Sequence, residues 1–223
     1  MHPFKHLKTV LKHKWFVFIY ACKLGIPIRG ILHDLSKFSF TEFYLSSKYY
    51  AGDKSPTILE RKDNNNISRI TLHHAVRQNH HWHHYVDYLD DGFIIAPMPY
   101  KYALEYVCDS ISANRVYNKK LDLDNAYDYY YNHSKTYVIH PGTKEFVLWS
   151  INEIRTKGFK VMKKKYTKAN FIRIMNKYDK SVFIPFNNFS LDYLNLKNFD
   201  DNEWGIILKL IVFFFSNYWN YFL

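Results

Sequence analysis

The sequence predicts an all-α fold, a helical bundle with a C-terminal appendage, and three observations favour a helical chain. The 223 residues hold only 7 Gly and 7 Pro, too few for the many turns of a sandwich or barrel. Hydrophobic residues make up 48% and aromatic residues 19%, which excludes a disordered chain. Several stretches also repeat apolar residues at helical spacing. We expect the bundle over residues 1–157 and a basic, aromatic appendage over residues 158–223.

The chain is expected to begin with two helices joined by a tight turn. Residues 5–24 repeat apolar side chains at a period close to that of a helix. Gly25, followed by Pro27, ends this helix, and residues 27–35 form the next one. The dipeptide His33-Asp34 therefore lies near a helix end.

The next stretch contains one further cap signal and one polar segment. Ser39 and Glu42 have the spacing of a capping box, which predicts a third helix. Residues 51–66 are polar and include three successive Asn, so we expect a surface loop or a mobile flap there. Residues 67–90 lack Gly and Pro and are predicted to form one helix, or two helices joined near Asn79.

The remaining elements are also expected to be helices. Further helices are predicted over residues 100–117, 121–131 and 144–157. The segment Trp204–Leu223 is about long enough to cross a bilayer, which takes roughly 20 apolar residues. Lys209 and polar residues interrupt it, so we favour a core helix, with an interfacial or tail anchor as the alternative.

Charge and cysteine content narrow the partners and the compartment. Lys and Arg number 31 against 20 Asp and Glu, a formal charge of +11, and the pI is near 9.4. Such a surface attracts nucleotides, nucleic acid or acidic lipid headgroups. Cys22 and Cys108 lack CxxC spacing, so we interpret both as reduced core residues. Residues 1–15 do not resemble a secretory signal, and we expect a cytoplasmic protein.

Histidines are concentrated in the string HHAVRQNHHWHH, which spans residues 73–84 and holds six of the twelve in the chain. Several imidazoles meeting without a metal would repel one another when protonated, whereas a divalent ion would satisfy their nitrogens. If this string is helical, its residues form two rows, with His73, Arg77, His80 and His84 in one and His74 and His81 in the other.

Further candidate ligands lie outside this string. His33-Asp34 offers an imidazole beside a carboxylate, and a carboxylate such as Asp34 can bridge two divalent ions. His13 lies on the preceding helix. Asp109 is flanked by apolar residues on the helix of residues 100–117, so it needs a metal or, alternatively, a Lys or Arg partner.

The order of these residues resembles a known superfamily. The pattern H…HD…H…HH…D is similar to that of the HD-domain superfamily of metal-dependent phosphohydrolases, and most to members that hold two or three metals. The strings HDLSKF and NHHW more closely resemble a small uncharacterised family of bacterial and phage proteins (DUF5662-like), over residues 5–155. Ser110 stands where that family usually has Trp, and the GYP signature of cyclic-dinucleotide phosphodiesterases is absent from the sequence.

This pattern predicts two metal sites and a hydrolytic activity. The resemblance implies an HD-domain-like helical bundle, and we expect two divalent transition metal ions (Fe, Mn, Zn or Ni) that activate a water for attack on phosphorus. Lys37 follows Asp34 by one helical turn and is expected to neutralise the phosphoryl oxygens, and Arg77 and His84 are candidates for phosphate contact. The first site is predicted to contain His13, His33, Asp34 and Asp109, and the second His74, His80 and His81 with Asp34 shared.

The predicted function is a metal-dependent phosphohydrolase or phosphodiesterase that acts on a nucleotide or a related phosphoester. One alternative is a metal-dependent nuclease, for which the basic run over residues 157–177 would follow a phosphate backbone. A second is a catalytically silent metal-bound protein that binds a partner or a membrane through its C-terminus. An oxygenase with two iron ions is a further, less favoured alternative.

Overall fold

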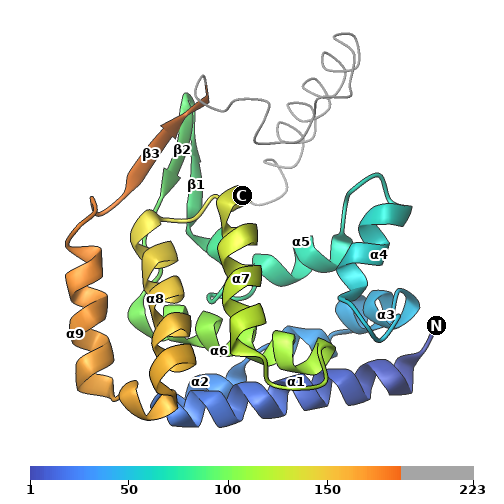
Figure 1. The fold of residues 1–223 in the computed structure, drawn as a ribbon. Coiled ribbons are helices and arrows are strands. Elements are labelled where there is room, and N and C mark those ends of the chain that lie inside the picture. Colours follow the sequence, from blue (N-terminus) through green and yellow to red (C-terminus); the bar gives the residue numbers. More distant parts are fainter. Residues whose placement is uncertain (187–223) are drawn as a thin grey trace. The chain divides into compact units, whose positions relative to one another are not determined.

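The computed structural model describes residues 1–186 and is mostly helical, as the sequence predicts. Figure 1 shows the arrangement, in which helices are joined by short 3-10 turns and a small sheet. The α-helices of the described part are α1 (Pro3–Lys23), α2 (Pro27–Leu32), α3 (Phe40–Lys48), α4 (Pro56–Asp63), α5 (Arg69–Ala75), α6 (Tyr100–Tyr117), α7 (Leu123–His133), α8 (Pro141–Lys157) and α9 (Lys164–Met175).

The first two helices follow the predicted boundaries closely. Helix α1 begins at a proline, which suits the first helical position because its missing N–H has no partner there anyway. It ends before Gly25, whose φ of 74° turns the chain into α2. Helix α2 crosses α1 at Gly30, where a Cβ would lie 2.7 Å from that of Ala21 and 2.9 Å from the Cα of Phe18. Only glycine permits this close approach.

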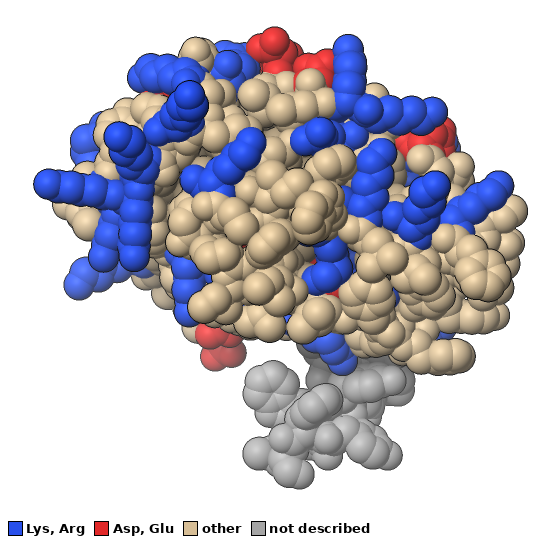
Figure 2. Space-filling model, turned by 90° about the horizontal axis from the view of Figure 1, so that it is seen from below, with Lys and Arg blue, Asp and Glu red and all other residues tan. Residues whose placement is uncertain are grey.

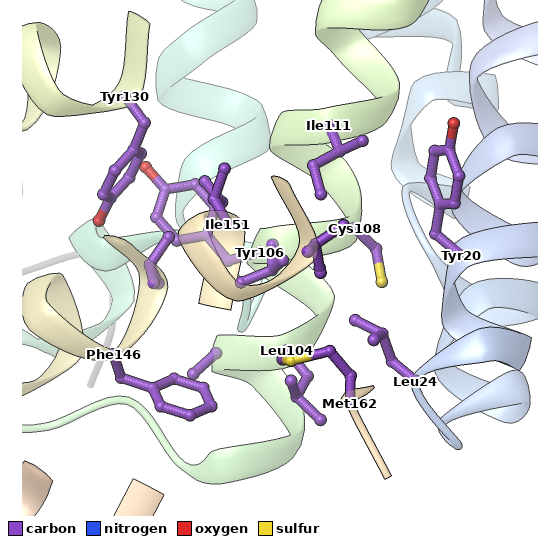
Figure 3. Close-up of a cluster of buried hydrophobic side chains, with 14 of the residues drawn as sticks. Tyr20, Leu24, Leu104, Tyr106, Cys108, Ile111, Tyr130, Phe146, Ile151 and Met162 are labelled. Carbon is purple, nitrogen blue, oxygen red and sulfur yellow. The ribbon is translucent and has the colours of Figure 1, made fainter. Parts of the chain in front are cut away.

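Helix α6 forms the centre of the hydrophobic core (Figure 3). Its residues Leu104, Cys108 and Ile111 are fully buried. Tyr20 of α1 packs on one side of this helix and Phe146 of α8 on the other. Truncating one such aliphatic residue to Ala costs about 2–5 kcal/mol of folding free energy. Cys108 is buried as predicted, but Cys22 is exposed, so the core assignment was wrong for that residue.

The structure contains a small three-stranded sheet, whose first strand lies within the stretch where helix was predicted. Its strands are β1 (Val86–Leu89), β2 (Gly92–Ile95) and β3 (Val182–Pro185), in the order β1-β2-β3. Strands β1 and β2 are antiparallel, with Val86 opposite Ile95. The helix predicted over residues 67–90 is therefore wrong beyond α5. Aromatic and β-branched residues on both sides of an Asp-Gly pair are a hairpin signal, and this signal outweighs the absence of internal glycine or proline.

The polar segment at residues 51–66 is also more ordered than predicted, because it contains α4. Pro56 begins this helix directly after Ser55, which is a usual pattern for a helix start. The loop was predicted from the polar composition, which does not take this pattern into account. The buried carboxylate of Glu60 accepts hydrogen bonds from the hydroxyl of Ser68 and the amide of Ile70. These contacts fasten α4 to the start of α5.

Residues 1–184 form one compact unit, and residues 185–223 are assigned to a second. Helix α9 packs against α8, and its residue Ile174 is fully buried in the core. The segment Trp204–Leu223 lies outside the described residues. Among residues 1–186, none of the helices has the length and apolar character needed to span a bilayer.

Candidate metal centre

The structure gathers the predicted ligand residues from five separate parts of the chain. Helix α1 carries His13, and α6 carries Asp109. His33 and Asp34 follow the end of α2, and His74 lies in the last turn of α5. His80 and His81 occupy the turn between α5 and the 3-10 helix Trp82–Tyr85. Two overlapping groups result, each with potential ligand atoms within 4.8 Å of one another: His13, His33, Asp34 and Asp109, and Asp34, His74, His80 and His81.

Asp34 belongs to both groups because its two oxygens face different imidazoles. Oδ1 lies 3.3 Å from Nε2 of His74 and 3.4 Å from Nε2 of His80. Oδ2 lies 3.2 Å from Nε2 of His33. The side chain is 1% exposed, and the backbone adopts the left-handed region with φ 53°, which Asp tolerates better than most residues. This turn directs the carboxylate between the two groups.

The first group is compact. Nε2 of His13 lies 3.0 Å from Oδ1 of Asp109 and 3.3 Å from Nε2 of His33. Nε2 of His33 is in turn 3.6 Å from the same Asp109 oxygen. Burial would raise the pKa of Asp109, but hydrogen bonds from His13 and His33 hold it well below its usual range. The carboxylate is therefore ionised, as metal coordination requires.

Polar atoms without a hydrogen-bond partner within these groups fit the binding of a cation. Nε2 of His80, Nε2 of His81 and Oδ1 of Asp34 are buried and make no hydrogen bond within the described residues. A buried polar atom without a partner costs about 1–3 kcal/mol, so such atoms usually have a ligand or water. Imidazole nitrogens and carboxylate oxygens are the donors that divalent transition metals take. The groups can hold metal ions on this ground.

Glu105 supports two of the imidazoles from behind. Its Oε1 lies 3.1 Å from Nδ1 of His33 and 3.3 Å from Nδ1 of His80, and its Oε2 accepts a hydrogen bond of 2.7 Å from Nε of Arg29. Burial opposes ionisation, yet the contacts with His33, His80 and Arg29 lower the pKa of Glu105 to about 2. Such a carboxylate fixes Nδ1 as the protonated nitrogen and leaves Nε2 free for metal.

The same three side chains, His33, His80 and Glu105, also form a third possible ligand group. The pairing of Glu105 with Arg29 favours the orienting role, because the cation already neutralises this carboxylate.

Glu42 contacts the imidazoles on the other side of the centre, as Glu105 contacts His33 and His80. Its Oε2 lies 3.0 Å from Nδ1 of His74, and its Oε1 lies 2.6 Å from Nδ1 of His73. Ser39 caps α3 as predicted, by accepting a hydrogen bond from the Glu42 amide. The Glu42 side chain, however, points inward to these imidazoles. Sequence reasoning missed this role, although Glu42 lies in the same motif as His33-Asp34.

Lys37 is the cation nearest to the bridging carboxylate. Its Nζ lies 2.5 Å from Oδ2 of Asp34, and its side chain is 31% exposed. Burial would lower the pKa of Lys37, but the charges of Asp34 and Asp109 hold it above its ordinary value. Lys37 is therefore a permanent positive charge between the ligand groups and solvent.

Arg77 and His84 lie outside both groups. Helix α5 ends at Ala75, so the helical row predicted from His73 to His84 does not form. Arg77 is exposed, and its guanidinium donates to the backbone oxygen of His73 at 2.9 Å. His84 is also exposed, with its ring against that of Tyr85. Their proposed contacts with substrate phosphate stay predictions.

Comparison with known proteins gives a family match over the part of the chain that contains this centre. The model of a family of unknown function, DUF5662, matches residues 2–153, which include every candidate ligand. No match was found among curated proteins or among solved structures. Since the match covers more than half of the sequence, the chain belongs to the DUF5662 family, whose function is unknown.

Proposed function

We propose that this protein is a metal-dependent phosphoester hydrolase with two divalent transition metal ions, acting on a nucleotide or a related phosphoester. One observation carries the proposal: the two oxygens of buried Asp34 face separate imidazole groups, at 3.2 Å from His33 and 3.3 Å from His74. A bridging carboxylate between two such groups is the usual way to hold a pair of ions a few ångströms apart.

The donor set limits the ions. Each group combines imidazole nitrogens with carboxylate oxygens, and the imidazoles favour Fe, Mn, Zn or Ni over Mg or Ca, which prefer oxygen ligands alone. When bound there, such ions polarise phosphoryl oxygens and lower the pKa of a bound water until hydroxide is available near neutral pH.

The side chains of the chain itself supply orientation and charge. Glu105 and Glu42 hold the imidazoles in one tautomer, and Asp34 and Asp109 supply the negative charge. The partly exposed Nζ of Lys37 neutralises negative charge that builds up on the phosphoryl oxygens during attack. Asp109 is also 17% exposed, so this side of the centre reaches solvent, and we place the phosphate group there.

Membership of the HD-domain superfamily is part of the same proposal. The chain order of His13, His33-Asp34, His74, His80-His81 and Asp109 supports it, and so does the meeting of these residues in two groups. A nuclease using these ions is the second candidate, since the start of α9 and the residue before it present exposed lysines at residues 163–165 and 168. This helix packs against α8, whereas the ligands come from α1, α5, α6 and the turns after α2 and α5. We therefore favour a small phosphoester as substrate.

The test combines elemental analysis with activity. We expect about two equivalents of one of these metals in the purified protein, and loss of both in Asp34→Asn, which keeps the size and the left-handed turn. The matched control His133→Asn removes an exposed imidazole and should retain both ions. Metal-loaded protein should cleave p-nitrophenyl phosphate, its bis ester or a nucleotide. A protein that folds without metal and cannot be reconstituted would contradict the proposal.

A further inference from the structure

We propose that the outer face of α1 and α2 is a binding surface for anionic lipid membranes. This inference is independent of the proposed catalytic activity. The face combines large exposed apolar side chains with lysines that have no acidic partner. Its apolar residues, hereafter the α1–α2 face, are Leu11, Trp15, Ile28, Ile31 and Leu32, with Leu35 of the adjoining 3-10 helix Leu35–Phe38.

Exposure of these side chains is extensive. Trp15 is 59% exposed, Ile28 70% and Ile31 58%, although each could have been polar without cost to the core. The two helices pack against each other, so these exposed residues belong to two neighbouring elements. Phe18 connects them, because its ring lies 6.0 Å from that of Trp15 and its backbone touches Gly30 of α2. Contiguous exposed apolar residues of this kind mark an interaction site.

The charge around this face has one sign. Residues 1–33 contain no Asp or Glu, and they contain six Lys or Arg residues. The first two acidic residues, Asp34 and Glu42, are both 1% exposed and point into the metal centre. Lys5, Lys8 and Lys12 form no ion pair within the described residues. Helices α1 and α2 lie at the bottom of Figure 1, and Figure 2 shows the molecule from below. Many Lys and Arg side chains and few acidic ones are visible in this view.

Charge complementarity selects the occupant. A second copy of the chain in a two-fold dimer would bring lysines against lysines. Trp204–Leu223 contains Lys209 and no acidic residue, so it offers no complementary charge either. Nucleic acid prefers aromatic platforms, whereas most of this face is aliphatic. An anionic bilayer satisfies both features, because apolar side chains enter the interface while Lys side chains extend to the headgroups.

The α1–α2 face and the candidate metal centre meet in one short segment of the chain. Ile31 and Leu32 are exposed, the next two residues His33 and Asp34 are buried in the centre, and Leu35 is exposed again. One short segment therefore carries both surfaces. Membrane binding through this segment would place the centre directly behind the lipid headgroups.

Vesicle sedimentation of the full-length protein tests this inference. We expect binding to vesicles of phosphatidylcholine mixed with phosphatidylserine, little binding to phosphatidylcholine alone, and weakening by salt. Lys8→Glu/Lys12→Glu should lower the partition coefficient for anionic vesicles tenfold or more. The matched control Lys164→Glu/Lys168→Glu makes the same charge change, also four residues apart, on exposed positions of α9, and should bind like the wild type.

A second pair of variants tests the apolar contribution. Trp15→Ser/Ile31→Ser should lose binding by a similar factor, whereas Leu72→Ser/Ile172→Ser removes exposed apolar groups elsewhere and should not. Unchanged melting temperatures would show that the variants are folded. Equal losses in both charge variants would assign binding to net charge and overturn the proposal. Unaltered binding by the face variants would assign it to another segment, and a dimer that Trp15→Ser/Ile31→Ser dissociates, without vesicle binding, would assign the face to self-association.

Discussion

Nδ1 of His33 lies 3.1 Å from Oε1 of Glu105, and this contact leaves Nε2 of the same ring facing Asp34. The two side chains come from positions far apart in the sequence, at the end of α2 and on α6. Neither could adopt this geometry without the packing of α2 and α6 around α1. The orientation of these candidate metal ligands therefore depends on how the helices of the core pack.

Glu105→Gln is predicted to weaken metal binding by about 10- to 100-fold, because it removes the charge that orients His33 and His80. Competition with a chromogenic chelator measures this affinity. The control is Glu145→Gln on α8, which alters an ion pair between Glu145 and Lys177 and should bind metal normally. An unchanged affinity in Glu105→Gln would show that the contact does not position the ligands.

Lys37→Met should keep the metal content and lose about 10²–10³-fold in kcat for phosphoester cleavage, since the lost charge acts on the transition state. Elemental analysis and steady-state kinetics on the same sample separate the two effects. Lys120→Met removes an exposed lysine and should be neutral. Loss of metal together with activity would instead assign Lys37 a structural part in holding Asp34.

Gly30→Ala is predicted to destabilise the fold by about 1–3 kcal/mol, because the new methyl group would meet the Cβ of Ala21 and the backbone of Phe18. Urea denaturation measures the change. Gly142→Ala is the comparison, and there the closest atom is the sulfur of a flexible side chain, Met175. We expect a smaller cost at residue 142, and equal costs would argue against a rigid crossing of α1 and α2.

Acid should destabilise the protein between about pH 6.5 and pH 4 in part through His6. Burial, with a smaller effect of Lys37, lowers the pKa of this imidazole from 6.5 to about 4. The unfolded chain then binds a proton that the folded chain excludes, so stability is lost as the pH falls through this range. His6→Phe should keep the contacts with Phe43 and flatten this part of the pH profile in urea titrations. A parallel profile in the variant would exclude His6 as a source of acid sensitivity.

The local features of this protein could be predicted from the sequence better than its long-range features. Helix α6 matches the predicted range of residues 100–117, because its apolar repeat and the preceding proline are local signals. His13, His33-Asp34 and Asp109 form a recognisable order in the sequence, and the structure brings them into one group that could hold a metal ion, while their role as ligands stays a prediction. The helix expected through His80 failed because a turn, and not a helical face, brings His80 and His81 to the centre.

Roles that depend on side-chain direction were beyond the sequence. Glu42 has capping-box spacing, and only the packing of α3 against α5 turns its carboxylate to His73 and His74. The partnership of Arg29 with Glu105 likewise joins residues with no sequence periodicity in common. Such contacts are set by the tertiary arrangement, which local propensity does not encode.

The ligands of the centre are spread along the chain from His13 to Asp109. Ions held there would act as removable crosslinks, closing the long loop between Asp34 and Asp109 much as a disulfide would. A backbone cut in the polar stretch before α5 would then leave two fragments that stay associated while the ions are bound. Removing the ions with a chelator would separate the fragments. The centre would thus link the two parts of the domain as well as carry its chemistry.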